Sequence, residues 1–168
     1  MKAKLKSHFL AFGPRRWVVF TVISLIITDI INCWYLKLYW LEKGVSEKLV
    51  EQSIAQSGYL IEDFAQSTIS EMTDFVNNTF YFFLFIILAN NYFFYCFYLR
   101  KKLWAQGYVL FYALTAAIFS VSFIVDNANL GAGWMIYNIL TIPFYIYLFL
   151  GVKMLKCETT LGHEKKAR

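Results

Sequence analysis

Residues 79–102 have the sequence TFYFFLFIILANNYFFYCFYLRKK, and this stretch decides the fold class. Its apolar part is about as long as the roughly 20 residues that a helix needs to cross a hydrocarbon core of roughly 30 Å. Aromatic residues gather at both ends, where amphipathic rings favour the headgroup level, and three basic residues close the run. Because lipid offers the backbone no hydrogen-bond partner, we predict a transmembrane helix over about residues 79–99.

Three further apolar stretches have a similar length. We predict membrane spans at about residues 17–36, 104–125 and 134–154, which gives four spans in all. The composition agrees, since 59% of the 168 residues are hydrophobic and only 16% are charged, with a mean hydropathy of +0.49. The sequence therefore predicts an all-α transmembrane bundle that forms one membrane domain over residues 1–168.

The basic residues predict the orientation of these spans. All of the 16 Lys and Arg residues except Lys37, Lys43 and Lys48 lie at the two termini or in the short turn between the second and third spans. Because basic residues stay on the cytoplasmic side of a bilayer, we predict cytoplasmic tails at 1–16 and 155–168. The net charge of +5 then reflects orientation rather than nucleic-acid binding, which needs a basic patch facing water.

Only the connection between the first two spans is long, and it is acidic. Residues 38–76 contain seven acidic residues and only two lysines. Apolar residues recur at helical spacing over about residues 45–75, so we predict an amphipathic helix outside the cytoplasm, with a break near Gly58. Its stripe would meet its own bundle, a second copy, or another membrane protein, because acidic residues disfavour anionic headgroups. The candidate partner-binding face consists of Val50, Ile54, Ile61, Phe64 and Met72.

One ionisable residue, Asp29, lies well inside a span. An aspartate at the centre of a membrane helix costs roughly 2.5 to 3.5 kcal/mol, so its carboxyl should face the bundle interior. At 1.5 Å per residue, each other span offers a polar side chain about 14 to 18 Å from its inner end. The predicted intramembrane polar layer consists of Asp29, Asn90, Thr115, Asn138 and Thr141.

Three roles are open for this polar layer. It can lock the helices together through hydrogen bonds, carry a proton or cation or hold a polar ligand around Asp29, or bind a partner helix. Pro143 cannot donate to the carbonyl of residue 139, so we also predict a bend in the fourth span near the depth of Asn138 and Thr141.

The sequence favours a chain without catalytic, metal or cofactor chemistry. The two histidines, His8 and His163, lie near opposite termini, and neither is near a spaced cysteine. There is no Cys-x-x-Cys pair, Gly-rich phosphate loop or nucleophile elbow in the chain. We therefore expect no enzyme, no metal site, no cofactor and no nucleic-acid partner.

The second half of the chain resembles a family of small four-helix bacterial inner-membrane proteins. The resemblance covers about residues 78–156 and rests on the basic turn at 98–102, the acid Asp126, and Ile-Pro-Phe-Tyr at 142–145 followed by basic residues. The glycine- and proline-rich first span of that family is missing here. The resemblance implies a bacterial cytoplasmic membrane but no activity. An alternative compartment is the endoplasmic reticulum, because residues 165–168 (KKAR) have the form of a Lys-Lys-x-x retrieval signal.

These observations favour a non-catalytic accessory or scaffold subunit that binds the lipid bilayer and either another membrane protein or further copies of itself. The alternative is a small oligomeric transporter or channel in which Asp29 is the ion-coupling carboxyl.

Overall fold

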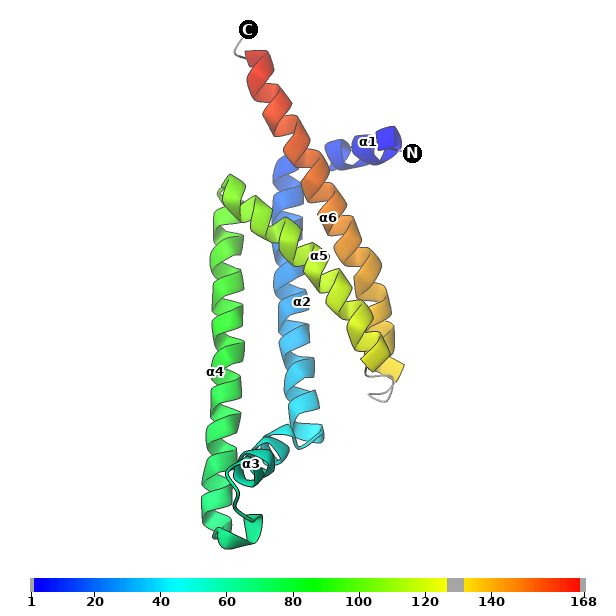
Figure 1. The fold of residues 1–168 in the computed structure, drawn as a ribbon. Coiled ribbons are helices and arrows are strands. Elements are labelled where there is room, and N and C mark those ends of the chain that lie inside the picture. Colours follow the sequence, from blue (N-terminus) through cyan, green and yellow to red (C-terminus); the bar gives the residue numbers. More distant parts are fainter. Residues whose placement is uncertain (1, 127–131, 167–168) are drawn as a thin grey trace. The chain divides into compact units, whose positions relative to one another are not determined.

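The computed structural model describes residues 2–126 and 132–166, and every regular element in these two ranges is helical (Figure 1). The tip of the connection after Asp126 and the last two residues of the Lys-Lys-x-x motif lie outside these ranges. The described elements confirm the all-α class and are α1 (Lys2–Phe12), α2 (Pro14–Glu42), α3 (Val45–Gln56), the 3-10 helix η1 (Ile61–Asp63), α4 (Gln66–Leu99), α5 (Leu103–Asp126) and α6 (Ala132–Lys166).

Four of these helices are long and apolar enough to cross a membrane, as the sequence predicts. The qualifying stretches are Pro14–Glu42, Gln66–Leu99, Leu103–Ser122 and Ala132–Leu155. Each predicted span lies within one of the four helices α2, α4, α5 and α6. The structure therefore confirms the four-span prediction by helix length and composition.

The helices extend further than the predicted spans. With 34 residues, α4 is about 50 Å long and so exceeds a hydrocarbon core of roughly 30 Å. Its first turns belong to the segment that the sequence assigned to the outside connection. At the chain's beginning, the predicted tail of residues 1–16 contains the separate helix α1. At the other end, α6 continues through Pro143 and into the predicted tail, as far as Lys166.

The chain divides into two compact units. We call the first, Met1–Ile26 with Tyr92–Arg168, the α5–α6 unit, and the second, Ile27–Asn91, the α3–α4 unit. Both α2 and α4 run through the boundary as continuous helices. The main hydrophobic core lies in the α5–α6 unit, where Leu25, Tyr95, Val109 and Leu148 are fully or almost fully buried.

Small residues on α5 face the core of the α5–α6 unit. Ala105, Ala113 and Ala117 are all buried, and they recur at multiples of four residues along one face of the helix. Small residues let two helix backbones approach closely, and the resulting van der Waals packing is one of the forces that drive helix association in a membrane. This pattern lets α5 pack closely along α6, and the two helices share an extensive interface.

The helix α1 is held against α2 and α6 by one aromatic cluster. The ring of Phe9, which is fully buried, meets Trp17 edge-on at a centroid distance of 4.8 Å and Tyr147 at 5.2 Å. Gly151 on α6 completes the cluster, because a Cβ atom there would lie 2.0 Å from Cζ2 of Trp17 and 2.9 Å from Cε1 of Phe9. We call Phe9, Trp17, Tyr147 and Gly151 the α1 seat.

In the α3–α4 unit, the predicted outside helix is interrupted near Gly58, as expected. Helix α3 ends at Gln56, and Gly58 has a φ of +81°, a left-handed conformation that glycine adopts without steric cost. The chain resumes as η1 and then as α4. On α3, Val50 and Ile54 are buried, so part of the amphipathic stripe packs within the chain itself.

Candidate functional site

The carboxyl of Asp29 is buried and hydrogen-bonded within the α3–α4 unit. Asp29 lies on α2 and is 4% exposed, and Nδ2 of Asn91 on α4 donates to its Oδ2 at 3.1 Å. Asn91 is also 4% exposed. Hydrogen bonds of this kind between membrane helices contribute about 0.6 kcal/mol on average, so this contact joins α2 to α4 at the depth of the predicted polar layer.

The structure brings Asp29 to Asn91 and not to the predicted Asn90. Asn90 is exposed on α4, whereas Asn91 begins a buried face that continues with Tyr95 and Tyr98. These three residues have the i, i+4, i+7 spacing of one helical face. Sequence reasoning could therefore have selected Asn91, because its face carries hydroxyl groups while the face of Asn90 carries Phe93 and Phe97.

Asn138 and Thr141 are buried on α6 in the α5–α6 unit. Nδ2 of Asn138 donates to the carbonyl of Trp134 at 3.0 Å, and Oγ1 of Thr141 donates to the carbonyl of Asn138 at 3.0 Å. The hydroxyl of Thr141 also lies 3.3 Å from Oγ of Ser120 on α5. Sequence reasoning missed Ser120, which is buried and joins the two helices.

Thr115, the remaining predicted polar residue, bonds within its own helix. Its Oγ1 donates to the carbonyl of Phe111 one turn earlier on α5. A hydroxyl that bonds back in this way is satisfied without any neighbouring helix. Three of the five predicted residues therefore lie in two polar clusters, Asp29 with Asn91, and Asn138 with Thr141 and Ser120. Asn90 is exposed, and Thr115 bonds within α5.

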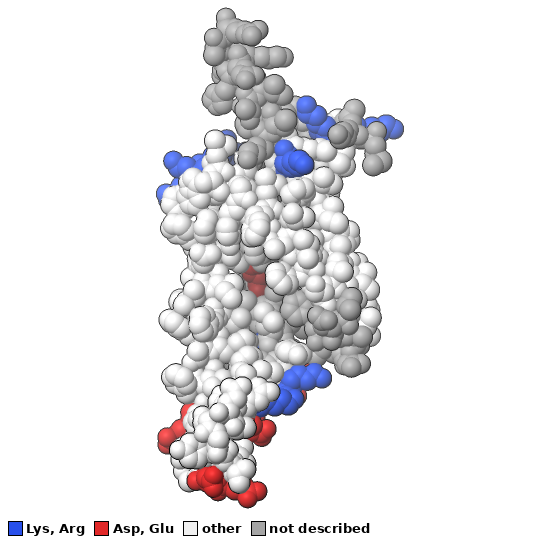
Figure 2. Space-filling model, viewed as in Figure 1, with Lys and Arg blue, Asp and Glu red and all other residues white. Residues whose placement is uncertain are grey.

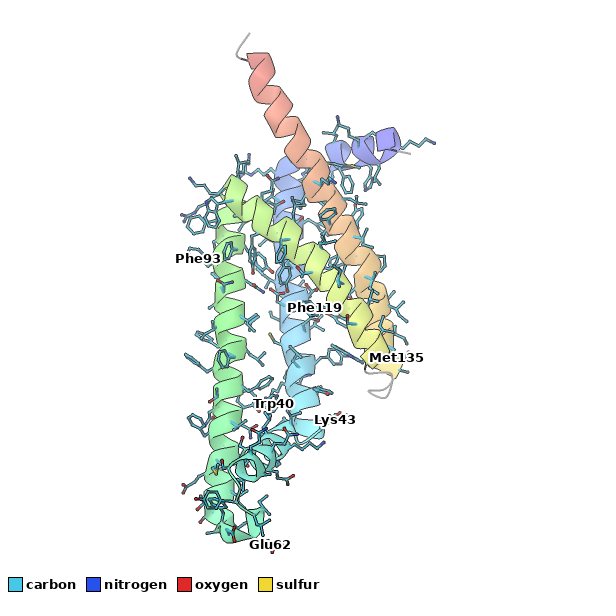
Figure 3. All side chains as sticks on the ribbon, in the orientation of Figure 1. Trp40, Lys43, Glu62, Phe93, Phe119 and Met135 are labelled. Atoms are coloured by element: carbon cyan, nitrogen blue, oxygen red, sulfur yellow. The ribbon has the colours of Figure 1, made fainter. Side chains whose placement is uncertain are left out.

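Three further contacts join α2 to α4 in the α3–α4 unit (Figure 3). Trp40 stacks on Phe80 with a centroid distance of 4.0 Å and an angle of 7° between the rings. Its Nε1 donates to Oδ1 of Asn77 at 2.7 Å. Lys37 lies one turn before Trp40, with Nζ 5.8 Å from the ring centre of Tyr81. Together with the contact between Asp29 and Asn91, these contacts hold the parts of α2 and α4 that belong to this unit together as an antiparallel pair.

An open groove lies between α3 and α4. It has a volume of about 290 Å³, and its lining is mostly apolar. Glu71 and the hydroxyls of Ser53 and Thr68 add polar groups. Phe75 is 72% exposed although it lines the groove. The lining residues are Val50, Ser53, Thr68, Glu71, Met72, Phe75 and Val76.

The five residues of the predicted partner-binding face differ in burial, and only some of them line the groove. Val50 and Ile54 are buried, Ile61 is exposed, and Phe64 and Met72 are half-buried. Of these five residues, Val50 and Met72 line the groove, while Phe64 packs edge-on against Tyr59 at 5.9 Å. Helical periodicity places Phe75 on the apolar stripe, but the predicted partner-binding face leaves it out, because the exposure of its ring depends on how α3 packs against α4.

Acidic side chains surround this part of the molecule. Figure 2 shows Asp and Glu gathered over the α3–η1 region. Glu47, Glu51, Glu62, Asp63 and Asp74 are all exposed there, and exposed Glu71 lies in the groove itself. The site can therefore receive an apolar side chain in the groove and basic side chains around it.

Within the described residues, no three His, Cys, Asp or Glu side chains come together in a group that could hold a metal ion. Cys33 and Cys96 are free thiols.

No protein-family model, curated protein or solved structure matches the chain. The resemblance to four-helix bacterial inner-membrane proteins therefore stays a prediction.

Proposed function

We propose that this integral membrane protein is a non-catalytic accessory or scaffold subunit, and that it binds another membrane protein through the groove between α3 and α4. The observation that carries the proposal is the open, mainly apolar groove with the exposed ring of Phe75 at its edge. Exposed aromatic surface next to a formed groove is typical of protein interaction sites.

Charge determines the kind of partner that fits. The segment around the groove is strongly acidic, so a second copy of the same segment would bring like charges together. The main basic clusters of a second copy cannot supply positive charge to the groove either. Arg15 and Arg16 begin α2 while Glu42 ends it, and that helix is long enough to cross the membrane, so the basic and acidic ends lie on opposite sides. The partner we propose is therefore a different membrane protein with an apolar anchor residue flanked by Lys or Arg.

Site-specific crosslinking tests this proposal. A photoreactive phenylalanine analogue at Phe75 in the full chain should crosslink one membrane-embedded protein. The same analogue at Tyr59, which is 59% exposed in the same unit but does not line the groove, should not. The double variant Glu71→Gln, Asp74→Asn should weaken the Phe75 crosslink, because it removes two of the charges that attract a basic partner.

Equal crosslinking from the two positions would overturn the proposal, as would a Phe75 product that contains only a second copy of this chain. Deletion of residues 45–72 should also abolish co-purification of the crosslinked protein in mild detergent. That deletion removes α3 and most of the groove lining.

A second candidate function is a small oligomeric transporter or channel that uses Asp29. The observation in its favour is the buried carboxyl of Asp29 on a membrane-spanning helix, since such residues often mark ion pathways. Asp29→Asn should abolish proton- or cation-dependent uptake into vesicles if this candidate is correct. Unchanged uptake together with loss of the partner on deletion of residues 45–72 favours the scaffold.

For the location, we propose a bacterial cytoplasmic membrane with both termini in the cytoplasm. The supporting observation is the position of the basic clusters at the ends of α2, α4 and α6. Tags at either terminus should resist protease added to sealed cells. Digestion of a tag from the outside would contradict this topology, and it would also place the groove on the cytoplasmic side.

A further inference from the structure

The groove between α3 and α4 begins at the membrane surface. A hydrocarbon core of about 20 helical residues, counted back from Leu99 at the end of α4, has its far edge near Phe80. Phe75 lies about 7 Å beyond that edge, at the level of the headgroups, and Thr68 lies about 18 Å beyond it. The groove therefore extends from the headgroups into water.

The contacts of Trp40 place the same level independently. Trp40 stacks on Phe80 at 4.0 Å, and its Nε1 donates to Oδ1 of Asn77 at 2.7 Å. Indole rings gather where membrane helices meet the headgroups, with one side apolar and the N–H bonded to a polar group. Val76, which lines the groove, directly precedes Asn77 on α4. One end of the groove thus lies beside the aromatic belt.

The chemistry of the groove changes along α4. Phe75 and Val76 line the end nearest the membrane, and residues 75–125 contain no Asp or Glu. Glu71 lines the groove one turn farther from the membrane, and Glu62 lies at the tip of the unit (Figure 3). A bound segment therefore meets apolar groups near the headgroups and carboxylates farther out.

An exposed face of α4 continues from the groove into the membrane. Phe75, Phe82 and Ile86 are 72%, 61% and 43% exposed. Their spacing of seven and four residues keeps them on one side of the helix. A helix that enters the membrane from the groove can therefore stay in contact with this side of α4.

We propose that the groove binds the juxtamembrane turn of a membrane-spanning helix of the partner. The apolar anchor of that turn contacts Phe75, and the Lys or Arg residues that follow it, farther from the bilayer, face Glu71 and Glu62. The partner's helix continues into the bilayer beside Phe82. This inference rests on the proposed function, and it adds which part of the partner is bound and in which order its residues occur.

A membrane helix fits this arrangement better than a free phospholipid does. The headgroup layer is about 5 to 7 Å thick on each side, so a lipid would leave the part of the groove near Thr68 and Glu71 unfilled. With the groove outside the cytoplasm, as proposed, Lys and Arg are uncommon at the adjoining end of a span. The carboxylates therefore select against most other membrane helices.

Crosslink mapping in the full chain tests the inference. A photoreactive phenylalanine analogue replaces Phe75 or Thr68, which both line the groove, and mass spectrometry identifies the crosslinked residue of the partner. The Phe75 product should lie within about one helical turn, or about four residues, of a membrane span. Because Thr68 is about 10 Å farther along α4, its product should lie about three to seven residues farther from the span, next to Lys or Arg.

Phe82 and Phe83 provide a matched pair of positions on the membrane-embedded part of α4. They are 61% and 58% exposed, but adjacent residues on a helix point about 100° apart. The analogue at Phe82 should crosslink within the span of the same partner, whereas the analogue at Phe83 should not crosslink this partner. Equal yields from the two positions would overturn the inference, because the partner's helix would not follow the side of α4 that continues the groove.

The position of the Phe75 product separates this inference from the proposed function. A product in a water-soluble region of the partner, far from any span, would overturn the inference while the proposed function stands. Loss of every protein product at Phe75 would overturn both. Since all four substituted positions are exposed, the analogue is not expected to disturb folding.

Discussion

The α1 seat and the groove between α3 and α4 are both mainly apolar, but they are packed in opposite ways. The seat is built from aromatic rings next to a basic stretch, and the groove has the ring of Phe75 next to an acidic stretch. In the seat, a single added carbon atom at Gly151 would lie 2.0 Å from the ring of Trp17. In the groove, about 290 Å³ is open and Phe75 is mostly exposed. The comparison teaches that the α1 seat is filled by side chains of the same chain and stabilises the fold. The groove, in contrast, leaves an apolar surface that another molecule can cover.

The largest expected effect is at the filled site. Gly151→Ala should destabilise the protein by roughly 3 kcal/mol, because Trp17 and Phe9 would have to move away from the new methyl group. The measurement is thermal unfolding in detergent. Gly107→Ala is the control, since a Cβ atom at Gly107 meets nothing within 4 Å and should leave the melting temperature unchanged or raise it.

A normal melting temperature for Gly151→Ala would mean that the seat is loose. The contrast between the two regions would then disappear, and the fixed position of α1 with it.

The second prediction concerns the closed floor of the groove. Val50 is 2% exposed, so Val50→Ala should cost about 2 kcal/mol of stability. Leu49→Ala, one residue earlier on α3, removes more carbon atoms but from an exposed side chain, and it should cost much less. Limited proteolysis of the α3 segment provides the measurement. Equal protection in the two variants would show that α3 does not pack through Val50.

The sequence predicted the spans because each depends on a long apolar run, and no distant contact is needed to recognise one. It also predicted the break near Gly58, since glycine permits a left-handed turn there. The choice between Asn90 and Asn91 was not settled by depth. Adjacent residues on a helix have almost the same depth but point about 100° apart, so the helical face on which each residue lies distinguishes them, and the face of Asn91 continues with Tyr95 and Tyr98.

Other features of the site depend on tertiary packing. Helix α1 lies in a basic stretch that resembles a flexible tail, and only the contacts of Phe9 with Trp17 and Tyr147 show that it is part of the folded unit. The exposure of the groove residues also depends on packing. Helical periodicity places Val50 and Phe75 on the same apolar stripe. The structure buries the first and exposes the second.

The third prediction extends the comparison to two adjacent residues on α4. Asn91→Leu removes the donor to Asp29 and should cost about 0.6 kcal/mol, the average for a hydrogen bond between membrane helices. Asn90→Leu changes an exposed residue of a membrane-spanning helix and should be neutral or stabilising. Thermal unfolding in detergent distinguishes the two variants. The reverse order of stabilities would place Asn90, and not Asn91, inside the bundle.

The smallest effect on stability is expected at Phe75, where the largest effect on binding is proposed. Phe75→Ser should change the free energy of unfolding by less than about 0.5 kcal/mol, because an exposed ring loses few contacts. The same variant should lose the membrane-protein partner in co-purification. The main effect of Val50→Ala, in contrast, should be on the free energy of unfolding. If Phe75→Ser unfolds the protein as much as Val50→Ala does, the ring of Phe75 is packed within the chain. The groove would then be a filled site like the α1 seat, and no surface would remain there for a partner.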